Sequence, residues 1–153
     1  MNRSQTLWLF LLRITMGWLF FWAGITKVLN PNFSAAGYLE GAKTFTGFFH
    51  WLASPEMLPF TNFINEWGLT LIGLALMLGI GTRIAARLGA VLMILYYLPI
   101  LDFPYPNAHA YIVDEHIIYA IALMLLDAFR AGRSYGYDAS LSQRFPQLAR
   151  LFR

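Results

Sequence analysis

Four long apolar runs constrain this chain more than any other feature of its sequence. They cover about residues 6–29, 63–81, 83–101 and 111–130. Each is close to the roughly 20 mainly apolar residues that a helix needs to cross a bilayer. The runs are continuous rather than alternating, which favours helices over a β-barrel. The sequence therefore predicts an all-α integral membrane protein, a four-helix transmembrane bundle.

Composition agrees with a membrane protein. Of the 153 residues, 58% are hydrophobic and only 12% are charged, whereas soluble domains carry about 25% charged residues. The net charge is +3, but the arginines lie beside the apolar runs, so we expect contacts with membrane lipids and no nucleic-acid binding. The absence of cysteine excludes disulfides, thiolate-held iron–sulfur clusters and covalently attached haem in this chain.

The chain divides into a transmembrane domain, residues 1–132, and a basic tail, residues 133–153. Residues 31–61 are too broken to span a membrane and too aromatic for a solvated loop, which predicts an interfacial cap between the first two helices. Ser34 is suited to cap a helix from Ala35 to Gly47. The short break at 81–83 predicts a tight hairpin, and the tail from Ala139 onward is expected to lie on the membrane surface.

Arginines in the short connections set the expected topology. They gather in the loop after the second helix and in the tail, at Arg83, Arg87, Arg130, Arg133, Arg144, Arg150 and Arg153. The positive-inside rule then places both termini in the cytoplasm. The two longer connections lie outside.

Helical periodicity assigns faces to the first two helices. One stripe of the first helix, expected to face the bundle, carries Arg13, Gly17, Phe20, Gly24 and Lys27. In the second helix one face, suited to close helix contact, has Gly68, Ala75 and Gly79, and the opposite face has Glu66, Thr70, Gly73 and Met77. Small residues let membrane helices approach closely. We expect a structural ion pair between Arg13 and Asp127, and a structural alternative for Lys27 is a salt bridge with Glu66.

Polar residues near the outer side form the candidate site. Glu66, His116 and Tyr119 are expected to converge beneath the cap and bind a quinone head group. Quinone reduction consumes protons, and histidine titrates near neutrality. The candidate catalytic residues are Glu66, His116 and Lys27, and the candidate cofactor-binding residues are Tyr119, Trp67, Glu115 and His109.

Two other interpretations of the outer polar residues remain open. Acids at a helix N-terminus complement the macrodipole, which is a structural role for Asp114 and Glu115. Glu66, His109, Glu115 and His116 could also supply nitrogen and oxygen ligands to a metal. No H-x3-H or E-x2-H pair lies on one helix, so no metal site is predicted.

Two segments resemble the DoxX family of membrane proteins. The first contains Leu12-Arg13-Ile14, Gly17-Trp18-Leu19-Phe20 and Ala23-Gly24-Ile25-Thr26-Lys27, and the second runs from Trp67-Gly68 to Thr82-Arg83-Ile84-Ala85-Ala86. Residues 33–39 and 113–120 resemble the DoxD branch, the membrane subunit of thiosulfate:quinone oxidoreductase. The resemblance implies a four-helix bundle in the plasma membrane of a prokaryote. It also implies partner subunits and electron transfer from thiosulfate to a membrane quinone, with tetrathionate as product.

A non-catalytic role is the alternative to a quinone-linked enzyme. The chain would then be a scaffold subunit of a larger respiratory or photosynthetic complex, or a homo-oligomer, in which the glycine faces matter most. A solute or lipid carrier would need an open polar path, which the bulky apolar middle of the last three helices disfavours.

Overall fold

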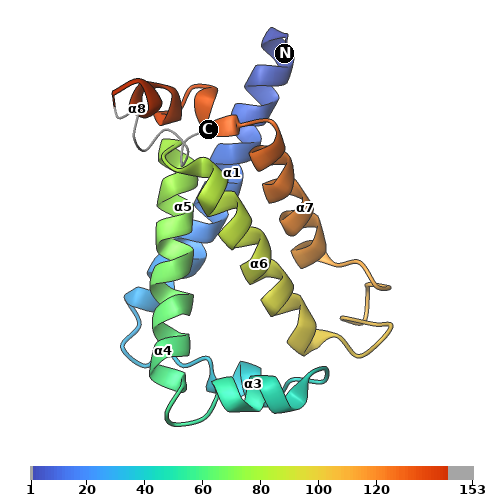
Figure 1. Cartoon of the computed structure of the whole chain (residues 1–153). Helices are drawn as coiled ribbons and strands as arrows, with labels where there is room; N and C mark the ends of the chain where they lie inside the picture. Colours follow the sequence, from blue (N-terminus) through green and yellow to red (C-terminus); the bar gives the residue numbers. More distant parts are fainter. Residues whose placement is uncertain (1, 145–153) are drawn as a thin grey trace.

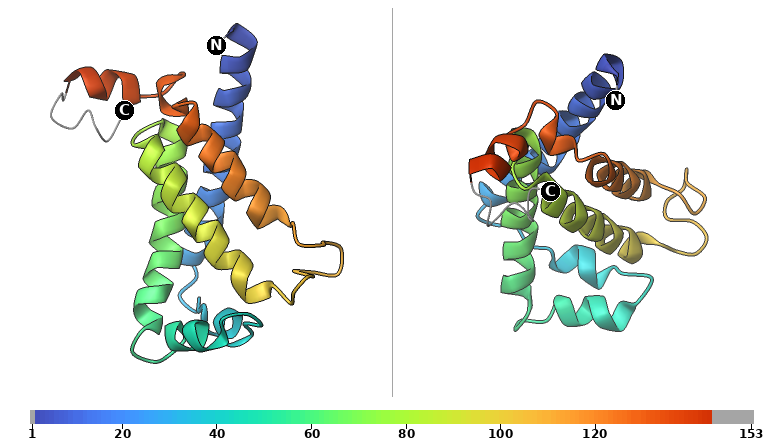
Figure 2. Two further views of the ribbon diagram at one scale, coloured as in Figure 1. Left: turned by 45° about the vertical axis from the view of Figure 1, so that its right-hand side comes forward. Right: turned by 45° about the horizontal axis from the view of Figure 1, so that its top comes forward.

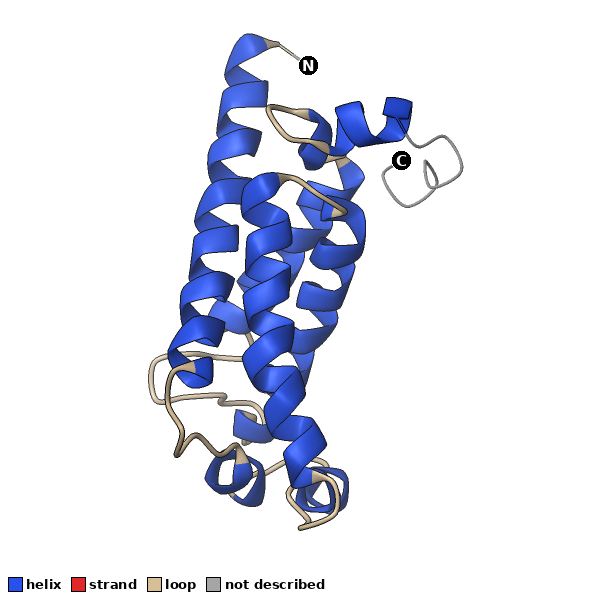
Figure 3. Ribbon diagram, turned by 90° about the vertical axis from the view of Figure 1, so that its left-hand side faces the viewer, coloured by secondary structure: helices blue, strands red, loops and turns tan. Residues whose placement is uncertain are grey.

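The computed structural model describes residues 2–144, and these residues form an all-α fold (Figure 1). The long helical segments are α1 (Arg3–Val28), α5 (Leu69–Leu78), α6 (Thr82–Ile100) and α7 (Glu115–Ala128). They pack along one another, α1 against α5, α5 against α6, and α6 against α7, with α1 also touching α7 (Figures 2 and 3). The short elements are α2 (Ala36–Glu40), α3 (Thr46–Leu52), α4 (Leu58–Phe63), η1 (Ile64–Gly68), η2 (Ala131–Arg133) and α8 (Asp138–Arg144).

Two of these helices, α1 and α6, are long and apolar enough to cross a membrane by themselves. Helix α5 is extended at its N-terminus by α4 and the π-helical turn η1, and together these three elements form one rod of about 30 Å at 1.5 Å per residue. Helix α7 has 14 residues, about 21 Å, and begins at Glu115 rather than at the predicted residue 111. The structure thus confirms an all-α fold with two apolar candidate spans.

Side chains at the ends of the helices explain where the helices start and stop. Asn2 and Gln5 form a reciprocal capping box, so α1 begins at Arg3 rather than near residue 6. Gly79 (φ 68°) ends α5 and Gly81 (φ 60°) precedes α6, both in the left-handed region that favours glycine. The predicted tight hairpin between these two helices is confirmed.

The predicted cap is present as two short helices rather than one. Helices α2 and α3 lie across the end of the bundle opposite to the N-terminus (Figure 1). A bend after Gly41 and the positive φ of Phe45 (51°) separate them, so the single helix predicted from Ala35 to Gly47 is wrong. Ser34 Oγ does accept a hydrogen bond from the Ala36 amide at 3.2 Å.

The closest helix contact in the bundle joins α1 to α5. A Cβ on Gly24 would lie 2.3 Å from the Thr70 nitrogen, and one on Gly73 would lie 2.2 Å from the Phe21 nitrogen. The predicted inward stripe of α1 is therefore confirmed. The prediction for the second helix is wrong in part. Its Thr70–Gly73 face makes the close contact with α1, and a Cβ on Gly68 would meet only Ile64, at 3.6 Å, whereas Gly79 on the predicted face does lie close to Arg13 and Gly136.

The sequence predicted an ion pair between Arg13 and Asp127, and this prediction is wrong. Arg13 is buried, but it binds other partners. Its guanidinium donates to the backbone carbonyls of Leu76 (2.9 Å), Tyr135 (3.1 Å) and Ser134 (3.3 Å). The last carbonyls of a helix have no intrahelical donor and carry the negative end of its dipole, so they attract a cation. Asp127 instead binds the two arginines that face it across the α6–α7 contact.

The tail packs against the α5–α6 turn. The Asp138 carboxylate accepts hydrogen bonds from the amides of Gly81 (2.7 Å) and Thr82 (3.2 Å), and thereby caps α6 from a distant part of the sequence. Helix α8 begins at this residue, one position before the predicted start of the surface segment. The remainder of that segment, residues 145–153, lies outside the described residues.

Candidate functional site

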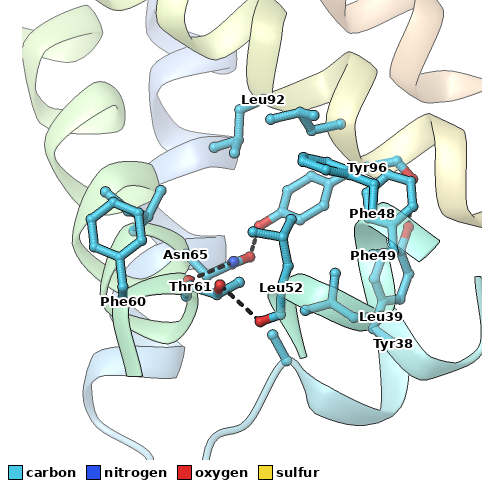
Figure 4. Close-up of a pocket in the computed structure, with 13 residues that line it drawn as sticks. Tyr38, Leu39, Phe48, Phe49, Leu52, Phe60, Thr61, Asn65, Leu92 and Tyr96 are labelled. Atoms are coloured by element: carbon cyan, nitrogen blue, oxygen red, sulfur yellow. Dashed lines mark hydrogen bonds between the residues drawn. The ribbon is translucent and has the colours of Figure 1, made fainter. Parts of the chain in front are cut away.

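The π-helical turn η1 brings Asn65 into the space beneath the cap (Figure 4). A single π turn within an α-helix contains one extra residue and is often found at functional sites. Asn65 Nδ2 donates to the Thr61 carbonyl at 2.9 Å, and its Oδ1 accepts a hydrogen bond from the Tyr96 hydroxyl. The amide orientation is thus fixed by one donor and one acceptor on two different elements.

Tyr38 and Tyr96 connect the cap to α6. The Tyr38 hydroxyl donates to the Tyr96 backbone carbonyl, and the two rings meet edge to face with centroids 6.1 Å apart. Burial, with a smaller contribution from the negative charge of Asp114, raises the pKa of Tyr38 to about 12. Tyr38 therefore remains a hydrogen-bond donor at any physiological pH.

Asp114 and His116 form a hydrogen-bonded pair at the start of α7. One Asp114 oxygen accepts the His116 amide at 3.0 Å as an N-cap, and the other lies 2.7 Å from His116 Nδ1. The Asp114 side chain is 1% exposed and that of His116 is 21% exposed. An ionised carboxylate only accepts hydrogen bonds, so Nδ1 is the protonated nitrogen and Nε2 is left for another partner.

Two cavities lie on either side of Tyr38, Asn65 and Tyr96. The polar cavity, of about 310 Å³, is lined by Lys27, Phe33, Ser34, Ala35, Tyr38, Asn65, Tyr96 and His116. The apolar cavity, of about 200 Å³, adds the cap residues Leu39, Phe48, Phe49 and Leu52 and residues of α4 and α6 to the shared wall (Figure 4). A ligand with a polar head and an apolar body matches this division.

Lys27 contributes a positive charge to the polar cavity. Its Nζ donates to the Ala23 carbonyl at 2.8 Å and lies 5.7 Å from the centre of the Phe33 ring. An ammonium group has three donors, so a bound ligand could accept from those that Ala23 does not use. Within residues 2–144 Lys27 forms no ion pair with Glu66, so the predicted salt bridge is absent there.

The structure brings together two of the predicted site residues, Lys27 and His116, in the polar cavity. The other five line neither cavity. Glu66 and Trp67 lie in η1, Tyr119 packs against the bundle core, Glu115 is exposed in the first turn of α7, and His109 is exposed in the loop before it.

Sequence reasoning missed the neighbours that complete this cavity. The sequence predicted for Asp114 a structural role through the helix macrodipole; the structure makes it the N-cap of α7, and its second oxygen also orients His116. The Asp-x-His spacing at a helix start was a signal for this pair, because an N-cap carboxylate reaches both the amide and the side chain two residues on. Tyr38, Asn65 and Tyr96 lay in three separate segments and gave no such local signal.

The described residues contain no group of three or more His, Asp or Glu side chains able to hold a metal ion. The polar side chains around the polar cavity carry one imidazole, one ammonium, two phenols, one aliphatic hydroxyl and one amide. Ammonium groups and phenols suit an organic ligand with hydrogen-bond acceptors better than they suit a cation.

Two helices that are long and apolar enough to cross a membrane, in an all-α fold, point to the class of helical membrane proteins. Residues 8–100 match the DoxX family model, and the chain belongs to the DoxX family. DoxX proteins are membrane proteins, and some are linked to thiosulfate:quinone oxidoreductase. Neither the curated proteins nor the solved structures yielded a match to this chain.

Proposed function

We propose that this chain is the membrane subunit of a quinone-linked oxidoreductase and that the polar cavity binds the quinone head group. The observation that supports this most strongly is the Asp114–His116 pair, which offers one imidazole nitrogen to a cavity that adjoins an apolar one. A quinone combines a polar ring with an apolar substituent, and its reduction requires a proton donor at each carbonyl oxygen.

Residues of the polar cavity have different roles in quinone reduction. Conversion of a quinone to a quinol adds two electrons and two protons. Protonated His116 donates from Nε2 to one carbonyl oxygen while Asp114 stabilises the imidazolium through Nδ1. Lys27 offers its remaining N–H groups to the oxygen on which negative charge develops. The half-buried Tyr96 ring and the exposed Tyr38 ring, which meet edge to face, hold the head group in place.

The membrane arrangement that accompanies this function is a four-span bundle. The rod formed by α4, η1 and α5 matches the roughly 30 Å of a bilayer's hydrocarbon core, as do α1 and α6. The N-terminal end of α1, the start of α6 with Arg83 and Arg87, and the η2 region with Arg130 and Arg133 lie at one end (Figure 1), which the positive-inside rule assigns to the cytoplasm of a prokaryotic cell. The cap and the cavity then face outward.

The electron donor in this proposal is thiosulfate, by analogy with the DoxX proteins linked to thiosulfate:quinone oxidoreductase. Two thiosulfate ions joined into one tetrathionate release two electrons and no protons. The quinone takes these two electrons and two protons: His116 delivers one proton to one carbonyl oxygen, and the other oxygen takes its proton from water on the outer side. Electron transfer in this chain involves either a partner subunit or a second copy of the chain.

Quinone binding tests the proposal directly. The purified protein is titrated with a short-chain ubiquinone, and reduction by thiosulfate is followed in proteoliposomes. His116→Ala should weaken binding about tenfold or more, since it removes a hydrogen bond to a charged group, and should abolish reduction. His50→Ala is the matched control, because His50 lies in α3 outside both cavities and contacts the Glu40 carbonyl. Equal quinone affinity in the His116 and His50 variants would reject the proposal.

A scaffold subunit is the second candidate function. The observation that favours it is the exposed aromatic surface of α1, where Trp18 and Trp22 stack with ring centroids 5.9 Å apart and are 52% and 57% exposed. This surface would pack against another membrane subunit. Trp22→Ala would then reduce co-purification of companion chains, whereas His116→Ala would leave it unchanged.

A further inference from the structure

A long apolar groove runs between α6 and α7 on the outside of the bundle. It has a volume of about 630 Å³, and its lining has no polar group apart from one arginine. Two buried alanines form the floor, and exposed aliphatic side chains form the rims. The lining residues are Arg87, Ala90, Val91, Ile94, Leu95, Ala120, Ile121 and Met124.

Two arginines stand at one end of this groove, held in place by one buried carboxylate. Arg83 Nε and Arg87 Nε bind the two oxygens of Asp127 at 3.0 and 2.7 Å. The Asp127 side chain is 8% exposed, while those of the arginines are 41% and 53% exposed. Each guanidinium uses only Nε for this contact, and within residues 2–144 its two terminal NH₂ groups bind no protein acceptor. The cluster keeps a net charge of +1 and presents preoriented donors.

We propose that this groove binds an anionic phospholipid, with its phosphate on Arg83 and Arg87 and one acyl chain between α6 and α7. Guanidinium groups bind phosphate oxygens in a geometry that pairs two N–H donors with two acceptors. Asp127 already orients both guanidinium groups before a lipid binds. Little side-chain conformational entropy is therefore lost on binding.

The dimensions and charge of the groove fit a lipid. From Arg87 to Leu95 the groove extends about 12 Å at 1.5 Å per residue, close to the roughly 15 Å of one leaflet's hydrocarbon. A net charge of +1 at its end complements a headgroup with one net negative charge and gives no preference to a zwitterionic one. A second transmembrane helix would need to bring its own acidic group to the same depth, so the lipid is the occupant that this site fits best.

Native mass spectrometry of the full chain tests the proposal. The detergent-solubilised protein is offered equal amounts of phosphatidylglycerol and phosphatidylcholine with the same acyl chains. We expect phosphatidylglycerol to be retained preferentially, and Arg87→Gln to reduce its occupancy about tenfold through loss of a charge-assisted hydrogen bond. The variant keeps the Arg83–Asp127 pair. Arg3→Gln, an exposed arginine at the start of α1, is the control and should retain the lipid.

A second variant and a soluble competitor separate the lipid from other occupants. Ala120→Phe fills the floor of the groove without changing charge and should also reduce lipid occupancy. Circular dichroism checks that this variant folds. If it does not fold, the result with Arg87→Gln alone tests the proposal. Glycerol phosphate should not displace the lipid. Equal retention of both lipids, unchanged occupancy in Arg87→Gln, displacement by glycerol phosphate, or a dimer that excludes lipid would each overturn the proposal.

Discussion

The two ends of the bundle differ in how far their charged side chains have their hydrogen-bonding groups paired within the protein. At the end that holds the tail, Arg13 and Asp138 bind backbone groups and are buried, and Asp127 binds two arginines. At the cap end, the side chains of Lys27 and His116 each make one hydrogen bond and keep further hydrogen-bonding capacity that faces a cavity. Charges with satisfied partners stabilise a fold, whereas buried or half-buried groups with spare capacity are the usual components of a binding site. The contrast assigns structure to the buried charges of the tail end and chemistry to the cap cavity; at the tail end the terminal NH₂ groups of Arg83 and Arg87 also keep spare hydrogen-bonding capacity among residues 2–144.

The largest expected effect on stability comes from Arg13→Met. The change removes the side-chain donor to the carbonyls of Leu76, Ser134 and Tyr135; the Leu76 carbonyl keeps the Gly79 amide, and the other two lose the hydrogen bond to Arg13. We expect a loss of about 3 kcal/mol in the free energy of unfolding, measured by denaturation in detergent. Arg3→Met, at an exposed position, is the control. A loss below about 0.5 kcal/mol would show that the tail end does not depend on this arginine.

The contact between α1 and α5 should give the next largest effect. Gly24→Ala places a Cβ against the backbone of Thr70, and such overpacking costs about 2 kcal/mol. Gly37→Ala is the control, because a Cβ there meets nothing within 4 Å. Thermal unfolding of the two variants compares them. Equal midpoints would contradict the close helix contact on the stripe of α1 that carries Gly24.

At the cap end, Asp114→Asn should affect activity more than stability. Asparagine is as good an N-cap as aspartate, so α7 should keep its start, but a neutral amide no longer stabilises a protonated His116. We expect quinone reduction to fall about tenfold, with the unfolding free energy changed by less than about 0.5 kcal/mol. If stability fell and the rate per folded molecule stayed the same, the pair would be structural, and the contrast between the two ends would fail.

The smallest effect is expected for Lys43→Ala. Lys43 and Asp102 form an ion pair at 3.1 Å with side chains 55% and 69% exposed, and such pairs contribute about 0.5 kcal/mol or less. The cap stays attached to α6 because the Lys43 amide donates to the Pro99 carbonyl at 2.9 Å, and Thr44 Oγ1 donates to the Leu101 carbonyl at 2.6 Å. A loss of more than about 1 kcal/mol in the unfolding free energy would show that this pair anchors the cap.

Local patterns in the sequence predicted the helices well because apolar length and turn residues act over short distances. The hairpin at Gly79 and Gly81 and the inward stripe of α1 follow from periodicity and from backbone preferences. The partners of Arg13 could not be predicted in this way. A search for an opposite charge led to Asp127, whereas the structure pairs Arg13 with carbonyls of α5 and the tail, groups that every residue carries and no residue type reveals.

The candidate site was predicted only in part for a similar reason. His116 and Lys27 were identified by residue type, and both line the polar cavity. Glu66 was expected beside them from an uninterrupted helix, but the π turn changes the register at that point and brings Asn65 to the cavity wall instead. Propensity and periodicity give no signal for one extra residue in a helical turn.

The π turn at Ile64–Gly68 acts as a single-residue insertion between two helical segments. One residue corresponds to about 100° of rotation, so the faces of α4 and α5 are set independently of each other. Deleting one residue within the turn would restore a continuous α-helix and rotate the cap-side half relative to the bundle-side half. The Gly73 contact with α1 and the Asn65 contact with Tyr96 could not then both form. The π turn thus lets a single helical rod orient two faces independently. One face packs in the bundle, and the other lines the cavity.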